Sequence, residues 1–316
     1  MRIVFMGTPQ ASVPSLERLI TDGHEIAAVY AQPDRPSGRG NKIAFSPVKE
    51  FALSRDLPMF QPVKTKAPET LNIFRSHTAD VAVVVAYGRI LPQTFLDAYP
   101  KGAINVHFSL LPKYRGAAPV NWAIVNGESE TGVTTMQMDA GLDTGAILGQ
   151  RATEIAPTQT SVELMTRLSE IGADLLAETL SNLDSIQPAA QEHDLSTYAP
   201  IMKREDGLID WRMSAAEISN RVRGFQPFPT SFTHFQNGKL TMWKAFPAPD
   251  PEYSGANFGE VIDVLGDAFL VGCGDGSILC IEEIQPEGKR RMSVRDFLNG
   301  SKLDKGSVLG TMQPSS

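Results

Sequence analysis

The chain has 316 residues, 42% of them hydrophobic, and a formal net charge of -7. That length and hydrophobic content suffice for about two globular domains. The acidic balance argues against a protein that coats nucleic acid without specificity, although it leaves room for a local basic patch. No hydrophobic run approaches the roughly 20 residues that span a bilayer, so we expect no membrane association.

The two cysteines, Cys273 and Cys280, have the spacing of neither a zinc site nor a CxxC redox pair. A framework of disulfides is therefore not expected. Two reduced structural thiols in a cytoplasmic protein are the simpler interpretation.

The first half of the chain alternates short hydrophobic strands with amphipathic helices. Residues 2–6 and 25–30 are predicted strands on either side of a helix, and residues 81–85 form an uninterrupted hydrophobic run. Such runs are typical of strands buried on both faces, so we predict an α/β domain with a mostly parallel sheet and helices on both faces. A long amphipathic helix at residues 160–183 closes it. The first turn lacks GxGxxG, so NAD binding is not expected.

A change in composition after residue 183 marks a second domain. Polar residues without a sustained period follow, and later come short alternating strands with tight turns, among them Asn237-Gly238. This pattern predicts a small antiparallel barrel. We place the first domain at residues 1–189, a linker at 190–206 and the second domain at 207–312.

Two polar residues interrupt a hydrophobic strand predicted at residues 103–108. Asn105 and His107 point to the same side, because side chains alternate along a strand. A second predicted strand, residues 131–138, leads into a loop that contains Asp143. We interpret Asn105, His107 and Asp143 as one catalytic cluster. The alternative is that Asn105 and His107 form a hydrogen-bonded pair in the core.

Three loops are expected to share one crevice. They follow predicted strands, and ligands bind at the carboxyl ends of the strands in open α/β sheets. The loops are residues 87–92, 109–115 and 139–145.

The segment 32–49 is basic. Arg35, Arg39, Lys42 and Lys49 outnumber its single acidic residue, Asp34. Proline and glycine are expected to keep it out of regular structure. It is either a solvated surface loop or a basic finger that grips phosphates.

Several segments together resemble the N10-formyltetrahydrofolate-dependent formyltransferases. They are Asn105-x-His107, Ser109-Leu110-Leu111-Pro112, Arg115-Gly116-Ala117-Ala118-Pro119 and Gly141-Leu142-Asp143-Thr144-Gly145. The start Met6-Gly7-Thr8-Pro9, the basic loop and the barrel extend the likeness to nearly the whole chain. They favour the branch whose formyl acceptor is the amino group of methionine on initiator tRNA. The resemblance implies a Rossmann-like catalytic domain and an OB-like, tRNA-binding C-terminal domain.

The resemblance also implies roles for individual residues, and the chain shows no departure at the three catalytic positions. N10-formyltetrahydrofolate is the implied formyl donor, no metal is required, and we expect a monomer. The implied folate-binding residues are Ser109, Leu110, Leu111, Pro112, Arg89, Ile90, Leu91, Asp139 and Gly141. The implied tRNA contacts are Arg35, Arg39 and Lys42. Further candidate phosphate contacts are Lys64, Lys66, Arg221, Arg223 and the basic run 289–291.

The expected reaction explains the residue types in the cluster. When a neutral amine attacks a formyl carbon, negative charge gathers on the formyl oxygen and positive charge on the nitrogen. Each preorganised donor at that oxygen is worth roughly 3 kcal/mol, and we assign this role to the Asn105 amide and a protonated His107. Asp143 can hold the imidazole in its charged form or take the proton of the amine through a water.

Two other functions remain open at this point. A folate-dependent formyltransferase acting on a small amine, such as glycinamide ribonucleotide or an amino sugar nucleotide, would share the catalytic cluster but would not explain the basic loop or the barrel. A non-catalytic RNA-binding protein built on the barrel would predict neither folate binding nor any effect of His107.

Overall fold

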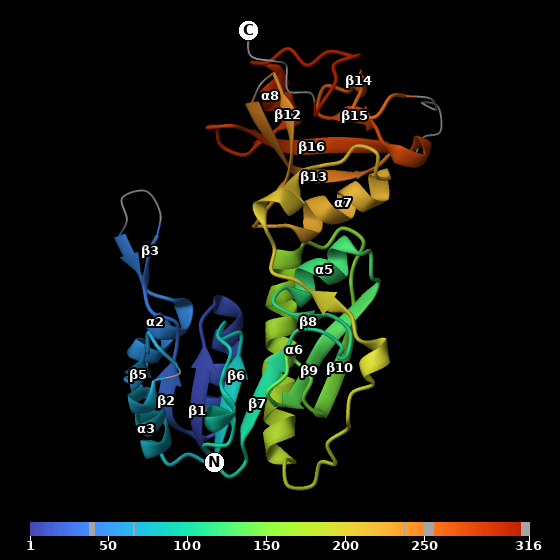
Figure 1. The fold of residues 1–316 in the computed structure, drawn as a ribbon. Helices are drawn as coiled ribbons and strands as arrows, with labels where there is room; N and C mark the ends of the chain where they lie inside the picture. Colours follow the sequence, from blue (N-terminus) through green and yellow to red (C-terminus); the bar gives the residue numbers. More distant parts are fainter. Residues whose placement is uncertain (38–41, 66, 237, 249–255, 311–316) are drawn as a thin grey trace. The chain divides into compact units, whose positions relative to one another are not determined.

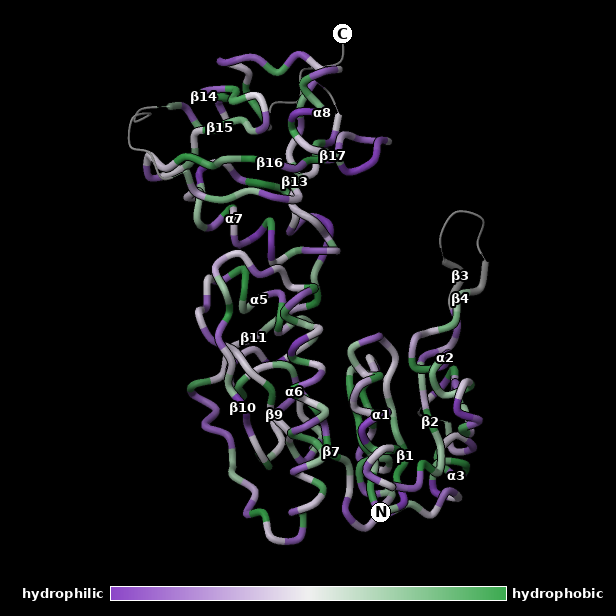
Figure 2. Tube along the Cα trace, turned by 180° about the vertical axis from the view of Figure 1, so that it is seen from behind, coloured by the Kyte–Doolittle hydropathy of each residue, from purple (hydrophilic) through white to green (hydrophobic). Residues whose placement is uncertain are grey.

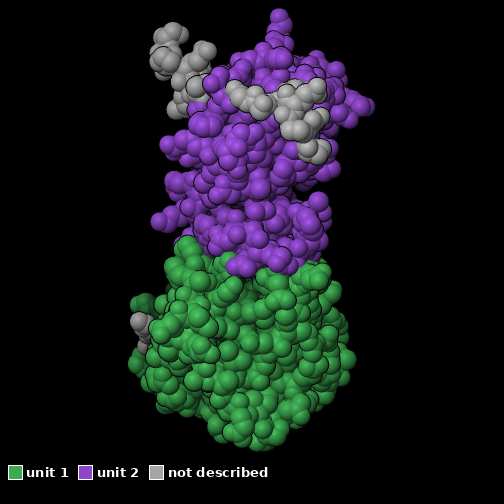
Figure 3. All heavy atoms as spheres, turned by 90° about the vertical axis from the view of Figure 1, so that its right-hand side faces the viewer, with its two compact units in different colours: residues 1–119, 130–154, 164–200 green, residues 120–129, 155–163, 201–316 purple. Residues whose placement is uncertain are grey.

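The structure is a computed structural model that describes the chain except residues 38–41, 66, 237, 249–255 and 311–316 (Figure 1). The chain forms two compact units (Figure 3). The first unit comprises residues 1–119, 130–154 and 164–200, and the second comprises residues 120–129, 155–163 and 201–316. The short stretches 120–129 and 155–163 therefore belong to the second unit, although residues on either side of each belong to the first.

A seven-stranded sheet lies at the centre of the first unit, in the order β10-β9-β7-β6-β1-β2-β5. The five strands from β7 to β5 in this order are parallel to one another. Strand β9 is antiparallel to β7, and β10 is antiparallel to β9. Every residue of β6 is buried, as its continuous hydrophobic sequence predicts. The strands are β1 (Arg2–Gly7), β2 (Glu25–Tyr30), β5 (Met59–Phe60), β6 (Val81–Val85), β7 (Ala103–His107), β9 (Glu130–Gln137) and β10 (Ile147–Glu154).

Helices flank this sheet and bury their hydrophobic faces. Leu16 and Leu19 of the first helix are fully buried, and the hydrophobic stretches of β1 and β2 can be followed in Figure 2. The predicted α/β class is confirmed. The helices are α1 (Val13–Thr21), α2 (Pro47–Ser54), α3 (Pro68–Ser76), α4 (Gln93–Leu96) and α6 (Ser161–Ser181), with 3-10 turns η1 (Gln10–Ser12) and η2 (His193–Leu195).

The second unit is built on an antiparallel sheet in the order β12-β13-β16-β15-β14, with β17 paired to β16. Its strands are β12 (Ser231–Phe235), β13 (Gly238–Pro247), β14 (Val261–Val264), β15 (Phe269–Gly272), β16 (Ile278–Pro286) and β17 (Met292–Ser293). Its helices are α5 (Pro119–Val125), α7 (Ala215–Gly224) and α8 (Val294–Leu298), with η3 (Arg204–Gly207) and η5 (Gly274–Gly276). The predicted separate antiparallel domain is confirmed, although Asn237 of its hairpin lies outside the described residues.

Two segments expected to be irregular contain strands. In the basic loop, β3 (Arg35–Ser37) pairs with β4 (Lys42–Ala44). The expectation that proline and glycine exclude regular structure there was wrong, because a two-stranded ribbon satisfies its backbone groups without a hydrophobic pattern. Within the predicted linker, β11 (Tyr198–Ala199) pairs in parallel with β8 (Arg115–Gly116).

Candidate active site

Asn105 is the central residue of β7 and is paired in register with Val84 of β6. Its side-chain Nδ2 donates to the Val84 carbonyl at 3.1 Å. The other amide atom, Oδ1, is buried and has no hydrogen-bond partner among the described residues. A buried polar atom without a partner costs about 1–3 kcal/mol, and such a cost is commonly retained where a ligand supplies the missing partner.

His107 is buried two residues further along the same strand. Its Nε2 lies 2.9 Å from the Tyr114 carbonyl oxygen, which can only accept, so Nε2 carries a proton and donates. Its Nδ1 lies 3.7 Å from Oδ2 of Asp143. That distance is too long for a hydrogen bond but suits an ion pair. Nδ1 is therefore the ring nitrogen left for the reaction.

The loop that carries Asp143 to this histidine does not begin at the end of the sheet that the sequence suggested. Because β9 is antiparallel to β7, its final residue Gln137 pairs with Ile104 near the start of β7. The rule of strand ends, from which we expected this loop to share a crevice with the loop after β7, therefore does not explain its position, although the loop does lie beside His107 and Gly116. The loop returns to His107 with Asp143 in a left-handed conformation (φ 54°).

The Asp143 carboxylate has one strong donor. The Gly116 backbone N–H donates to Oδ2 at 2.8 Å, and the side chain is only 17% exposed. Both nitrogens of His107 thus face an oxygen, the Tyr114 carbonyl at Nε2 and the Asp143 carboxylate at Nδ1. Asn105, His107 and Asp143 together present an amide, an imidazole and a carboxylate to one place on the sheet.

Two polar side chains, one from β9 and one from β10, form hydrogen bonds with the turn that follows β7. The Thr134 hydroxyl donates to the Ser109 carbonyl at 2.7 Å and accepts from the Leu111 N–H at 3.1 Å. Gln150 donates to the Leu111 carbonyl at 2.8 Å. Ser109 and Leu111 are buried, and Leu110 and Pro112 are half-buried. The turn is thus a fixed wall next to the catalytic strand.

The remaining predicted folate residues have diverse surroundings. Arg89 donates to the Val63 carbonyl at 2.6 Å, Ile90 is 78% exposed, and Leu91 is buried in a hydrophobic cluster with Tyr87. Asp139 caps its own loop, accepting from the Gly141 N–H at 3.0 Å and from the Thr144 hydroxyl at 2.7 Å. No contact brings Arg89 to the catalytic cluster among the residues that the structure describes.

The base of the basic loop is closed by a clamp of three side chains. Lys49 pairs with Asp34 and also donates to Gln61 at 2.9 Å, while Gln61 donates to Asp34 at 2.8 Å. The Gln61 amide and the Lys49 ammonium lower the pKa of the Asp34 carboxyl. Lys49 is thereby an anchor of the loop. Arg35 and Lys42 lie in β3 and β4, and Arg39 lies outside the described residues.

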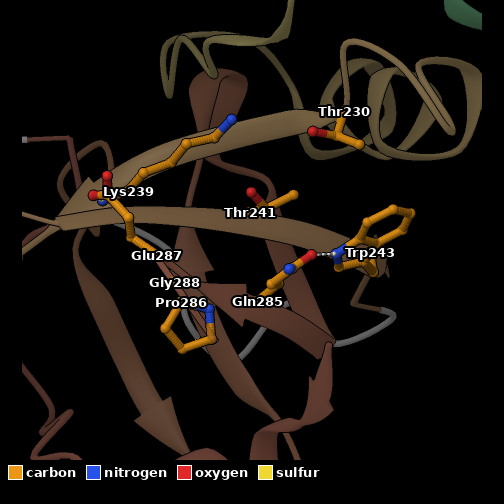
Figure 4. A pocket seen from close by; sticks show the side chains of 8 residues that line it. All are labelled: Thr230, Lys239, Thr241, Trp243, Gln285, Pro286, Glu287 and Gly288. Carbon is orange, nitrogen blue, oxygen red and sulfur yellow. Dashed lines mark hydrogen bonds between the residues drawn. The ribbon is translucent and has the colours of Figure 1, made fainter. Parts of the chain in front are cut away.

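A shallow groove of about 330 Å³ lies on the second unit (Figure 4). Alternate residues of β13, namely Lys239, Thr241 and Trp243, line one side of it, and Gln285 accepts from the Trp243 indole at 3.0 Å. The guanidinium of Arg291 lies 4.9 Å from the centre of the Trp243 ring. This side of the sheet therefore offers an aromatic ring and cations together.

Two of the other candidate cations serve the fold. Arg221 donates to the Asp206 carbonyl at 2.6 Å, and Arg223 donates to the Gln159 carbonyl at 3.0 Å. Burial lowers the pKa of both guanidinium groups. Their expected role as phosphate contacts does not fit these positions.

The described part of the chain has neither a cluster of metal-binding side chains nor a helix that could span a membrane. No group of three or more His, Cys, Asp or Glu side chains there could hold a metal ion. No described helix is both long enough and apolar enough to cross a membrane.

The comparisons with known proteins agree with the geometry. The family model Formyl transferase matches residues 1–180, and Formyl transferase, C-terminal domain matches residues 201–302. A methionyl-tRNA formyltransferase of Geobacter sulfurreducens is 46% identical over 98% of this chain and 97% of its own, and one of Koribacter versatilis is 49% identical over 99% of each. A sugar 3N-formyl transferase, solved in the presence of dTDP and 5-N-formyl-THF, covers 92% of this chain and 99% of its own, with 20% identity and a TM-score of 0.66.

Proposed function

The chain belongs to the formyl transferase family, and we propose that it transfers the formyl group of N10-formyltetrahydrofolate to the α-amino group of methionine on initiator tRNA, giving formylmethionyl-tRNA for translation initiation. The observation that carries this proposal is the 46–49% identity over nearly the full length of methionyl-tRNA formyltransferases. N10-formyltetrahydrofolate supplies the formyl group. The cytoplasmic location and the monomeric state remain predictions.

The catalytic cluster supports the chemistry of this transfer. The second N–H of the Asn105 amide is available to the oxygen on which negative charge develops. The Asp143 carboxylate beside Nδ1 of His107 stabilises positive charge that gathers there during the transfer. The Asp143 carboxylate is the base that can take the proton of the attacking amine, directly or through a water.

The rival proposal is transfer to a small amine. A sugar formyl transferase shares the fold over 92% of this chain, so a second domain alone does not select tRNA as the acceptor. Sequence identity and the basic loop favour tRNA. The test is formyl transfer by the wild-type protein to methionyl-initiator tRNA, with glycinamide ribonucleotide as the competing acceptor. We expect transfer to the tRNA, and transfer to the small amine alone would contradict the proposal.

The basic loop is proposed to hold the phosphates of the tRNA. The Lys49–Asp34–Gln61 clamp supports this role, because it fixes both ends of a segment that contains Arg35 and Lys42. The groove around Trp243 and Lys239 is the candidate RNA contact on the second unit.

Replacing Arg39 with alanine is expected to raise the KM for tRNA and leave the KM for folate unchanged. Loss of one phosphate contact should reduce the slope of log affinity against log salt by about 1. Steady-state kinetics at several salt concentrations check this, with Arg75→Ala, an exposed arginine of α3, as the control. An unchanged dependence on tRNA and on salt would contradict the assignment.

A further inference from the structure

The segment 189–199, which we call the return segment, carries polar contacts to the catalytic cluster that the reaction as proposed does not use. Gln191 is 6% exposed and lies in this segment. Its Nε2 donates to the backbone carbonyls of Asp143 at 2.9 Å and of Gly145 at 2.7 Å. One amide group thus fixes the backbone on both sides of Thr144, at Asp143 itself and at Gly145.

The orientation of this amide follows from its partners. Arg115, itself buried, directs Nε and Nη2 at the Gln191 side chain at 3.0 Å and 2.6 Å. Guanidinium groups only donate, so the atom that faces Arg115 is Oε1 and the NH₂ group faces the two carbonyls. Both ends of the Gln191 amide are therefore fully engaged.

The same segment also supports the partner of His107. The Thr197 hydroxyl accepts from the Tyr114 N–H at 2.8 Å, and the Tyr114 carbonyl accepts from His107. The pairing of β11 with β8 fixes Gly116, whose N–H donates to Asp143. Gly116 has φ +119°, and a Cβ there would lie 2.6 Å from the Ala199 oxygen, so this close approach requires glycine.

We propose that Gln191 is a positioning residue for formyl transfer, acting through Asp143. A non-glycine residue at φ 54° adopts a strained conformation that persists only where its surroundings hold it. Gln191 supplies that restraint by holding the carbonyls of Asp143 and Gly145, and Arg115 holds Gln191 in turn. The carboxylate then keeps its 3.7 Å distance from Nδ1 of His107. The inference rests on the proposed function.

The first test is the nearly isosteric Gln191→Met, which removes both donors. We expect kcat to fall by about 10–100-fold, the range for loss of a supporting contact or a displacement of about 1 Å. The KM values for folate and tRNA should change less than twofold. A loss confined to KM, or an unchanged kcat, would overturn the proposal.

A double-mutant comparison separates positioning from a merely structural role. In an Asp143→Asn background, measured by single turnover with excess enzyme, Gln191→Met should cost less than twofold, because the carboxylate that it positions is already gone. The same 10–100-fold loss in both backgrounds would overturn the proposal. If the methionine variant does not fold, Gln191→Glu replaces it in the test. Glutamate keeps an acceptor for Arg115 but has no donors, so we expect the same kcat loss.

The chain offers a matched control in Gln226, a buried glutamine of the second unit. Its Nε2 also donates to two backbone carbonyls, those of Val222 at 3.0 Å and Trp243 at 2.9 Å. Gln226→Met should lower Tm to an extent similar to that in Gln191→Met. It should leave kcat at saturating substrates unchanged. A wild-type protein without formyl transfer would refute the proposed function. An active wild type with equal kcat in Gln191→Met would refute only the role of Gln191.

Discussion

Asp143→Asn is expected to lower kcat by about 10²–10⁴-fold, the contribution of a general base, while folate binding stays normal. Asparagine is the gentlest change at this position. It tolerates the left-handed conformation, and its side-chain oxygen can still accept from the Gly116 N–H. The charge is lost, and with it both the base and the anion beside Nδ1 of His107.

Single-turnover formyl transfer with saturating donor measures this loss, and folate titration shows whether binding survives. Asp184→Asn is the control, because it removes an exposed carboxylate of the same unit, which pairs with the side chain of Lys101. A rate within threefold of wild type in Asp143→Asn would show that the carboxylate is not the base.

Asn105→Ala is expected to lower kcat by about 10²–10³-fold, the loss typical of one donor at a developing negative charge. Its effect on stability should be small. The substitution removes the hydrogen bond to Val84, worth about 1 kcal/mol, and also removes a buried oxygen without a partner, which costs about 1–3 kcal/mol. We therefore expect the two changes nearly to cancel and Tm to move by no more than about 4 °C.

Thermal unfolding and kcat are measured on the same preparation. Asn182→Ala, which removes an exposed amide that donates to the Glu178 carbonyl, is the control. Should Tm fall steeply in Asn105→Ala while kcat holds, Asn105 would be a core residue, the alternative that the sequence left open.

The strands around the site could be predicted because their patterns are local. The predicted strand at 103–108 is β7, the hydrophobic run at 81–85 is β6, and the helix at 160–183 is α6. Alternation along β7 was enough to place Asn105 and His107 on one side. The loop after the second predicted strand added Asp143 to this pair, and the family resemblance supported that choice.

The support of the site could not be predicted, because it joins positions far apart in the chain. Gln191 lies 48 residues after Asp143 and 76 after Arg115. Its segment is polar and aperiodic, so composition indicated a linker at 190–206. The rule of strand ends also gave the wrong reason for the position of the loop at 139–145, because nothing local in β9 indicates that it runs antiparallel. The sequence indicated the positive charge of the basic loop. It did not indicate the Lys49–Asp34–Gln61 clamp, because Gln61 is uncharged.

The measurement that tests the central claim most directly is formyl transfer to methionyl-initiator tRNA and to glycinamide ribonucleotide, with wild type and His107→Ala side by side. We expect transfer to the tRNA by the wild type and a loss of at least about 10²-fold in His107→Ala. Transfer to the tRNA that survives without His107 would contradict the catalytic cluster, and transfer to the small amine alone would contradict the acceptor.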